Sequence, residues 1–137
     1  MIWVGIDPGV NTGWAVWTGK AFSELETLPL HRAMLRLLEL IQDYDVHVVF
    51  EDARQRKWIP QERTLSEFRG RAMGAGSVRR DCAIWEAVCK DYRIPYDAVP
   101  PRAGMTKLSE DAFARLTGWA TRTSNHARDA AMLVFDK

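Results

Sequence analysis

The opening of the chain follows a β-type pattern in three short runs separated by turn residues. Ile2 to Asp7 is mostly apolar and ends at Pro8-Gly9. The segments 12–18 and 21–27 continue the pattern, and Gly19-Lys20 between them suits a tight hairpin turn. This pattern predicts three consecutive strands arranged as a β-meander.

A helical period and a buried strand follow the meander. Pro29 stands where a first helical residue is expected, because its fixed φ suits that position. Apolar residues then recur at helical spacing, at Leu30, Met34, Leu37, Leu38 and Ile41. The run 46–50 is typical of a strand buried on both faces, and Glu51 stands at its end. A helical connection would make this strand parallel to the first one.

The remaining elements are predicted from shorter signals. The polar, basic segment 52–71 predicts a connection, and a helix is expected from Met73 or Val78 to Tyr92. The run 96–99 resembles a strand, and Ser109 and Ser124 are typical N-caps of two last helices. The predicted fold is α/β, in the order β-β-β-α-β-α-β-α-α, with a mixed five-stranded sheet and one domain over 1–137.

The helix that ends at Tyr92 has more apolar surface than one contact needs. A stripe that can cover the sheet steps by four and three, at Val78, Cys82, Trp85, Cys89 and Tyr92. Ile84 and Val88 lie outside this stripe, so the helix is either buried more deeply or forms a homodimer contact. Its two cysteines would lie roughly 10 Å apart, too far for a disulfide within the chain.

Composition and charge narrow the class of protein. No apolar run approaches the roughly 20 residues that cross a bilayer, and the N-terminus lacks the features of a signal peptide. Together with reduced cysteines, this predicts a cytoplasmic protein. The net charge is only +1, but residues 54–80 carry eight basic and two acidic residues. Such a run is either a solvated loop or a phosphate-binding surface, and the arginines with Trp58 among them favour the second.

Three acidic residues and one histidine stand at positions that suggest chemistry. Asp7 and Glu51 each end an apolar strand, and parallel neighbouring strands would bring both carboxylates to one edge of the sheet. His126 and Asp129 are three residues apart on a helix and therefore share one face. Carboxylate ligands of this kind suit Mg²⁺ or Mn²⁺, and two such ions can support phosphodiester hydrolysis.

Each of these residues also has a simpler explanation. Asp7 before Pro-Gly could form an Asx turn, and Glu51-Asp52 could be a solvated strand end. His126 could be a surface residue, and Asp129 could be a helix-surface carboxylate near the helix N-terminus. Lys107 could contact the scissile phosphate or be solvated, and Trp58 could stack on an unpaired base or fill the edge of the core.

Three motifs resemble the RuvC family of Holliday junction resolvases, in particular its short phage-type members. They are Gly5-Ile6-Asp7-Pro8-Gly9-Val10-Asn11-Thr12-Gly13, then Val49-Phe50-Glu51, then Asn125-His126-Ala127-Arg128-Asp129-Ala130. The predicted order of elements is similar to the RNase H-like fold of that family, and the resemblance covers nearly the whole chain.

The resemblance implies a homodimer that nicks four-way DNA junctions with two Mg²⁺ or Mn²⁺ ions. It makes Asp7, Glu51, His126 and Asp129 metal ligands and catalytic residues, with Lys107, or else Arg102, as the basic residue before the last helices. It also implies a dimer through the helix 78–92. The expected DNA contacts are Arg54, Arg56, Lys57, Trp58, Arg69, Arg71, Arg102 and Lys107.

The segment after Glu51 departs from the family pattern. Better-known members place an aromatic residue a few positions beyond the glutamate, whereas here residues 52–57 precede Trp58. Trp58 or Arg54 is therefore the candidate for the residue that wedges the junction point. Two other classes of protein are alternatives. An actin-like or sugar-kinase ATPase would need a second domain and a further Gly-rich segment, and a junction-binding protein of the same fold would bind without cleaving. Cleavage of forks, flaps or RNA–DNA hybrids is also compatible with the fold.

Overall fold

The computed structural model describes residues 1–56, 65–101 and 107–137, without the side chains of residues 68, 71 and 72. The elements follow in the predicted order, with one added 3-10 turn. They are β1 (Ile2–Asp7), β2 (Asn11–Trp17), β3 (Phe22–Pro29), α1 (Leu30–Asp43), β4 (Val46–Glu51), η1 (Ala53–Gln55), α2 (Leu65–Asp91), β5 (Tyr96–Val99), α3 (Glu110–Thr117) and α4 (Asn125–Val134).

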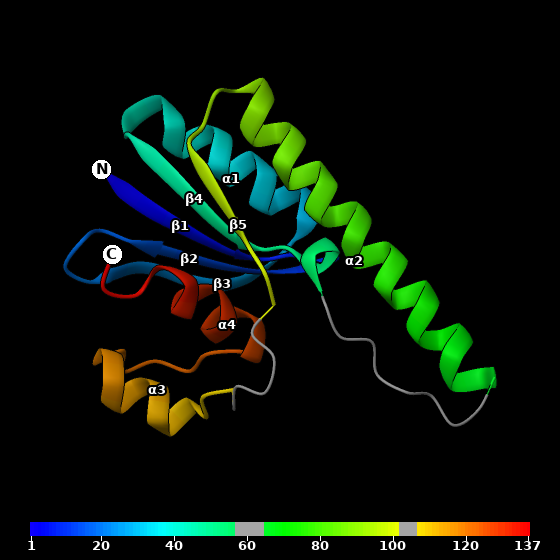
Figure 1. The fold of residues 1–137 in the computed structure, drawn as a ribbon. Coiled ribbons are helices and arrows are strands. Elements are labelled where there is room, and N and C mark those ends of the chain that lie inside the picture. The colour runs from blue at the N-terminus through cyan, green and yellow to red at the C-terminus, as the bar shows by residue number, and fades with distance from the viewer. Residues whose placement is uncertain (57–64, 102–106) are drawn as a thin grey trace.

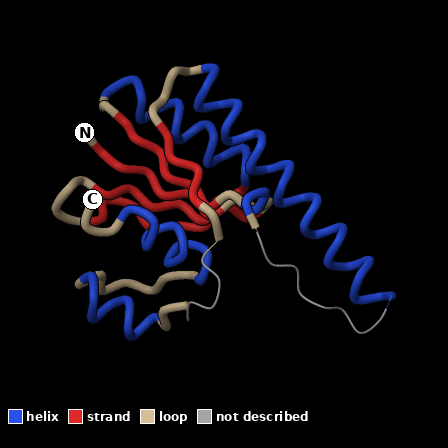
Figure 2. Tube along the Cα trace, viewed as in Figure 1, coloured by secondary structure: helices blue, strands red, loops and turns tan. Residues whose placement is uncertain are grey.

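The five strands form one mixed sheet in the order β3-β2-β1-β4-β5, drawn in red in Figure 2. β1 pairs antiparallel with β2, which confirms the meander, and parallel with β4, as the helical connection predicts. In this register Ile6 stands opposite Phe50, so Asp7 and Glu51 follow side by side at the same sheet edge.

Helices cover both faces of the sheet (Figure 1). On one face α1 and α2 pack on apolar residues of the central strands, and Trp14, Phe50 and Trp85 are fully buried there. On the other face α4 packs chiefly on β2 and β1, with α3 outside it. The chain is therefore a three-layer α/β fold with a five-stranded mixed sheet.

The caps of the last two helices form as predicted, but one helix start was placed wrongly. Ser109 and Ser124 each accept a hydrogen bond from the backbone N–H three residues ahead. Pro29, in contrast, is not the first helical residue: its ψ of 144° is extended, and it ends β3 in the N-cap position of α1. Pairing of Pro29 with Asn11 keeps it in the strand.

Helix α2 begins earlier than predicted, at Leu65 rather than at Met73 or Val78. Its N-terminal half extends past the edge of the sheet (Figure 1), and added Cβ atoms at Gly70, Gly74 and Gly76 would meet nothing within 4 Å. This half contains three glycines, which weaken its helical signal in the sequence. It is helical because propagation from an existing helix is easier than nucleation.

The C-terminal half of α2 faces the sheet through the predicted stripe. Cys82, Trp85 and Cys89 are fully buried, and both cysteines are free thiols. The prediction of this stripe was wrong at its last residue, because Tyr92 lies beyond the end of the helix and is 54% exposed. Within the described ranges, no helix has the length and hydropathy needed to cross a membrane.

Candidate functional site

Two glycines let helix α4 lie directly on the backbone of the sheet. A Cβ at Gly13 would come within 2.6 Å of the His126 carbonyl carbon, and a Cβ at Gly5 within 3.0 Å of that of Ala130. Side chains at either position would push the helix outward. Sequence reasoning used these glycines only as part of a motif, and their effect is to bring the helix that carries His126 and Asp129 to the end of β1.

Two short contacts join the candidate residues at this sheet edge. Asp7 Oδ2 lies 2.9 Å from His126 Nδ1, and Lys107 Nζ donates to Asp129 Oδ2 at 2.8 Å. The Asp7 carboxylate therefore faces α4 rather than forming an Asx turn, and the Thr12 hydroxyl bonds to the Gly9 carbonyl in that turn instead. The two carboxylates are mostly shielded from solvent, whereas the Lys107 and His126 side chains are more than half exposed.

The carboxylates also act on one another electrostatically. Burial is the main reason why the pKa of Asp7 is raised, and the charge of Asp129 adds to it. Burial likewise raises the pKa of Glu51, followed by the charges of Asp7 and Asp129. The charge of Lys107 works in the opposite direction on the pKa values of Asp7 and Glu51. The structure thus brings the five predicted residues into one electrostatic cluster.

The donor types of this cluster fit a hard divalent cation, since they are three carboxylates and one imidazole. In the described part of the chain, however, no three His, Cys, Asp or Glu side chains converge closely enough to hold an ion as they stand. The hydrogen bonds give the reason, because Asp7 faces His126 and Asp129 faces Lys107. Metal binding would require these two carboxylates to rotate away from their present partners.

The backbone that carries Glu51 is held from several sides. The Asp52 N–H donates to the Val99 carbonyl at 2.7 Å. The Asp52 carboxylate is buried and accepts from the backbone N–H and the guanidinium of Arg54, with Asp52 Oδ1 2.8 Å from Arg54 Nε. Arg54 also lies 3.4 Å from Glu86 on α2. The expectation of a solvated strand end is therefore wrong at Asp52, which sequence reasoning missed as a positioning residue.

The basic residues predicted to contact DNA have different surroundings. Arg54 is engaged by Asp52 and Glu86, so a DNA contact would compete with these ion pairs. Arg56 is exposed, and its charge lowers the pKa of Glu51, while Arg69 is exposed on α2. The predictions at Lys57, Trp58 and Arg102 lie outside the described residues, as does the side chain of Arg71.

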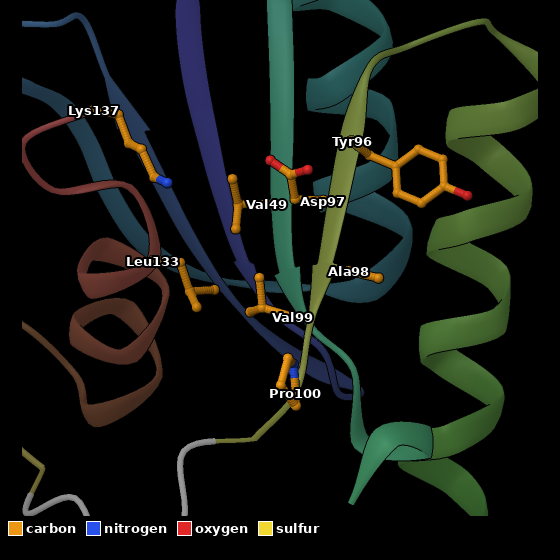
Figure 3. A pocket seen from close by; sticks show the side chains of 8 residues that line it. All are labelled: Val49, Tyr96, Asp97, Ala98, Val99, Pro100, Leu133 and Lys137. Atoms are coloured by element: carbon orange, nitrogen blue, oxygen red, sulfur yellow. The ribbon is translucent and has the colours of Figure 1, made fainter.

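A cavity of about 580 Å³ opens between β5 and α4 (Figure 3). It is lined by Val49, Tyr96, Asp97, Ala98, Val99, Pro100, Leu133 and Lys137. It forms because α4 packs on β1 and β2 and leaves much of the face of β4 and β5 uncovered. None of the five cluster residues lines it, so the chemistry of the cluster lies outside this cavity.

A scan against protein-family models finds no match, and a search of curated proteins finds no significant match. The cluster and the motifs that form it are therefore the features from which a function can be inferred.

Proposed function

We propose that this protein is a divalent-metal-dependent endonuclease that nicks branched DNA, with the four-way junction as its main substrate. The observation that carries the proposal is the cluster at the shared end of β1 and β4. There burial and the charge of Asp129 raise the pKa of Asp7, and burial and the charges of Asp7 and Asp129 raise the pKa of Glu51. Unfavourable clustering of carboxylates is typical of a site whose charge is balanced by a bound cation.

The roles of the residues follow from their positions. Asp7, Glu51, His126 and Asp129 would hold two Mg²⁺ or Mn²⁺ ions, which would supply an activated water and stabilise the leaving oxygen. The exposed Lys107 ammonium lies beside the carboxylates and can bind a phosphate oxygen that arrives at the cluster. His126 and Asp7 contact each other in the present arrangement, and this contact would open when both bind an ion.

Binding of DNA is proposed to use the basic surface that follows β4. Arg56 lies close enough to Glu51 to affect its pKa, so a phosphate bound there would be near the cluster. Arg69 extends this surface along α2. A homodimer through α2 would present two clusters to one junction, which paired nicking requires.

The test compares synthetic four-way junction, fork, flap, plain duplex and RNA–DNA hybrid at equal concentration and fixed salt, with Mg²⁺ or Mn²⁺. We expect symmetrical nicks in the junction, and we expect Asp7→Asn to abolish them while binding is retained. Asp45→Asn, an exposed aspartate away from the cluster, is the matched control. Cutting retained in Asp7→Asn would refute the site, and tight junction binding without nicks would show a non-cleaving binding protein.

A further inference from the structure

Arg128 of α4 is a buried arginine that points away from the cluster. It is 8% exposed, although it stands next in sequence to Asp129. Its guanidinium donates to the Thr123 carbonyl at 2.6 Å, to the Thr123 hydroxyl at 2.9 Å and to the Asn125 side chain. Its Nε donates to the Leu108 carbonyl at 3.1 Å. These acceptors are all uncharged oxygens, so hydrogen bonds to neutral groups compensate for the burial of the guanidinium charge.

The bond to Leu108 matters because Leu108 follows Lys107. The Lys107 side chain is 73% exposed, and among the described residues its ammonium forms an ion pair with Asp129. A long exposed lysine loses substantial rotamer entropy when it is fixed in one place. Its ammonium can therefore be kept at Asp129 only if its own backbone is fixed relative to α4. Arg128 supplies this link across 20 residues of sequence.

We propose that Arg128 is a positioning residue that holds the backbone beside Lys107, so that the Lys107 ammonium stands at the Asp129 carboxylate. The inference rests on the proposed function, because the purpose of this placement is phosphate binding at the cluster. Within the described residues, the hydrogen bonds of the Arg128 guanidinium go to Leu108, Thr123 and Asn125 and not to the cluster carboxylates. Its effect on cleavage passes through Lys107.

The placement is tested first without any nuclease assay. A carbodiimide joins an amine to a carboxylate only where the two are in contact, so the Lys107–Asp129 cross-link, quantified by mass spectrometry, reports the ion pair directly. In Arg128→Lys the single ammonium cannot reach both Leu108 and Thr123. We expect its Lys107–Asp129 cross-link to fall toward the background measured in Asp129→Asn.

Two control variants separate positioning from general loosening. Arg122→Lys adds an equal amine at an exposed arginine nearby, and Thr123→Val removes a hydroxyl acceptor of Arg128 but leaves the Leu108 carbonyl in place. Both are expected to keep the wild-type cross-link. Thermal unfolding of each variant is measured to check that the fold is intact. An unchanged cross-link in folded Arg128→Lys overturns the proposal, as does an equal loss in Thr123→Val.

The second test uses junction nicking in a double-mutant cycle. Arg128→Lys is expected to lower kcat about 10-fold with KM little changed, in the range seen for residues that orient a catalytic group. In the Lys107→Ala background the same change is expected to have no further effect. Additive losses would overturn the proposed route through Lys107. If the wild type does not nick at all, the proposed function fails, and the cross-link still decides whether Arg128 positions Lys107.

Discussion

At the scale of single residues, Asp7 is the clearest case of a side chain that opposes stability. It is partly buried beside another carboxylate, and its pKa is raised above the ordinary value of 3.8, chiefly by burial. Its hydrogen bond to His126 offsets only part of this effect. A carboxylate that is harder to ionise in the folded state destabilises that state wherever it is charged.

The first prediction is therefore that Asp7→Asn stabilises the metal-free protein at neutral pH. Below 3.8 the carboxyl is protonated in both states and the variant has no advantage. As the pH rises through the raised folded pKa, the wild type loses stability relative to the variant. We expect the melting temperature of Asp7→Asn to exceed that of wild type by a few degrees at neutral pH, measured in chelator.

The control for this prediction is Asp45→Asn, which changes an exposed aspartate in the same way. Its melting temperature should equal that of the wild type at every pH. An increase in the melting temperature of Asp7→Asn that was as large at acid pH as at neutral pH would contradict this explanation. Such an increase could not come from removal of the ionised carboxylate.

The residue scale also shows what could be predicted from sequence and what could not. Asp7 and Glu51 were identified because each ends an apolar run, where a charged side chain is unexpected. Asp52 was not, because a carboxylate directly after Glu51 looks like a continuation of a polar loop. Its burial depends on Arg54, two residues later, folding back onto it. That ion pair cannot be seen in a pattern of hydrophobic and polar positions.

At the scale of elements, the packing of α4 on β1 and β2 determines the site. The glycines at positions 5 and 13 allow this contact, and Gly13 is the more direct case because its backbone lies against both His126 and Asp7. An added methyl group there must move either the helix or the strand end. Overpacking of this kind costs about 1–3 kcal/mol.

The second prediction is that Gly13→Ala lowers the free energy of unfolding by about 1–3 kcal/mol and reduces junction nicking together with it. Chemical denaturation measures the first effect and a nicking assay the second. Gly74→Ala is the matched control, since Gly74 lies in α2 with open space around it. It should stabilise the helix by roughly 0.5–1 kcal/mol. If Gly13→Ala and Gly74→Ala had equal free energies of unfolding and equal nicking rates, the position of α4 would not depend on its close contact with Gly13.

Local signals were enough to predict most elements but not the start of α2. Strand β5 and the caps at Ser109 and Ser124 depend on neighbouring residues, and all three were predicted correctly. The N-terminal half of α2 extends past the edge of the sheet and has open space around its three glycines. Its glycines favour a loop when they are considered alone. The helix continues through them only because its other half is fixed on the sheet.

At the scale of the whole molecule, the cluster assembles from four separate segments of the chain. The parallel pairing of β1 and β4 could be predicted from the helical connection between them. The approach of α4 and of the segment at Lys107 could not be derived from spacing. It depends on tertiary packing at Gly13 and on the buried Arg128.

The third prediction concerns the coupling of metal binding to folding. An ion that binds only the folded state stabilises it by about 2.7 kcal/mol at a free concentration of 100 times Kd. We expect Mn²⁺ to raise the melting temperature of wild type and of Asp45→Asn, and to raise that of Asp7→Asn much less. A rise of equal size in all three proteins would place the bound ion away from Asp7.

The fourth prediction is that the protein forms a homodimer through the outer face of α2. Ile84 and Val88 lie one turn apart outside the buried stripe and are partly buried, Val88 with one side packed against the core, while Tyr92 beyond them is exposed. Ile84→Lys should shift the protein from dimer to monomer in sedimentation velocity at micromolar concentration, because a lysine at the contact would have to be desolvated.

Leu35→Lys is the matched control, since Leu35 is exposed on α1, a different helix. The dimer contact lies elsewhere if both variants stay dimeric. If the wild type is a monomer, paired nicking must instead come from two molecules that meet only on the junction, and nicking of the two strands would then depend separately on protein concentration.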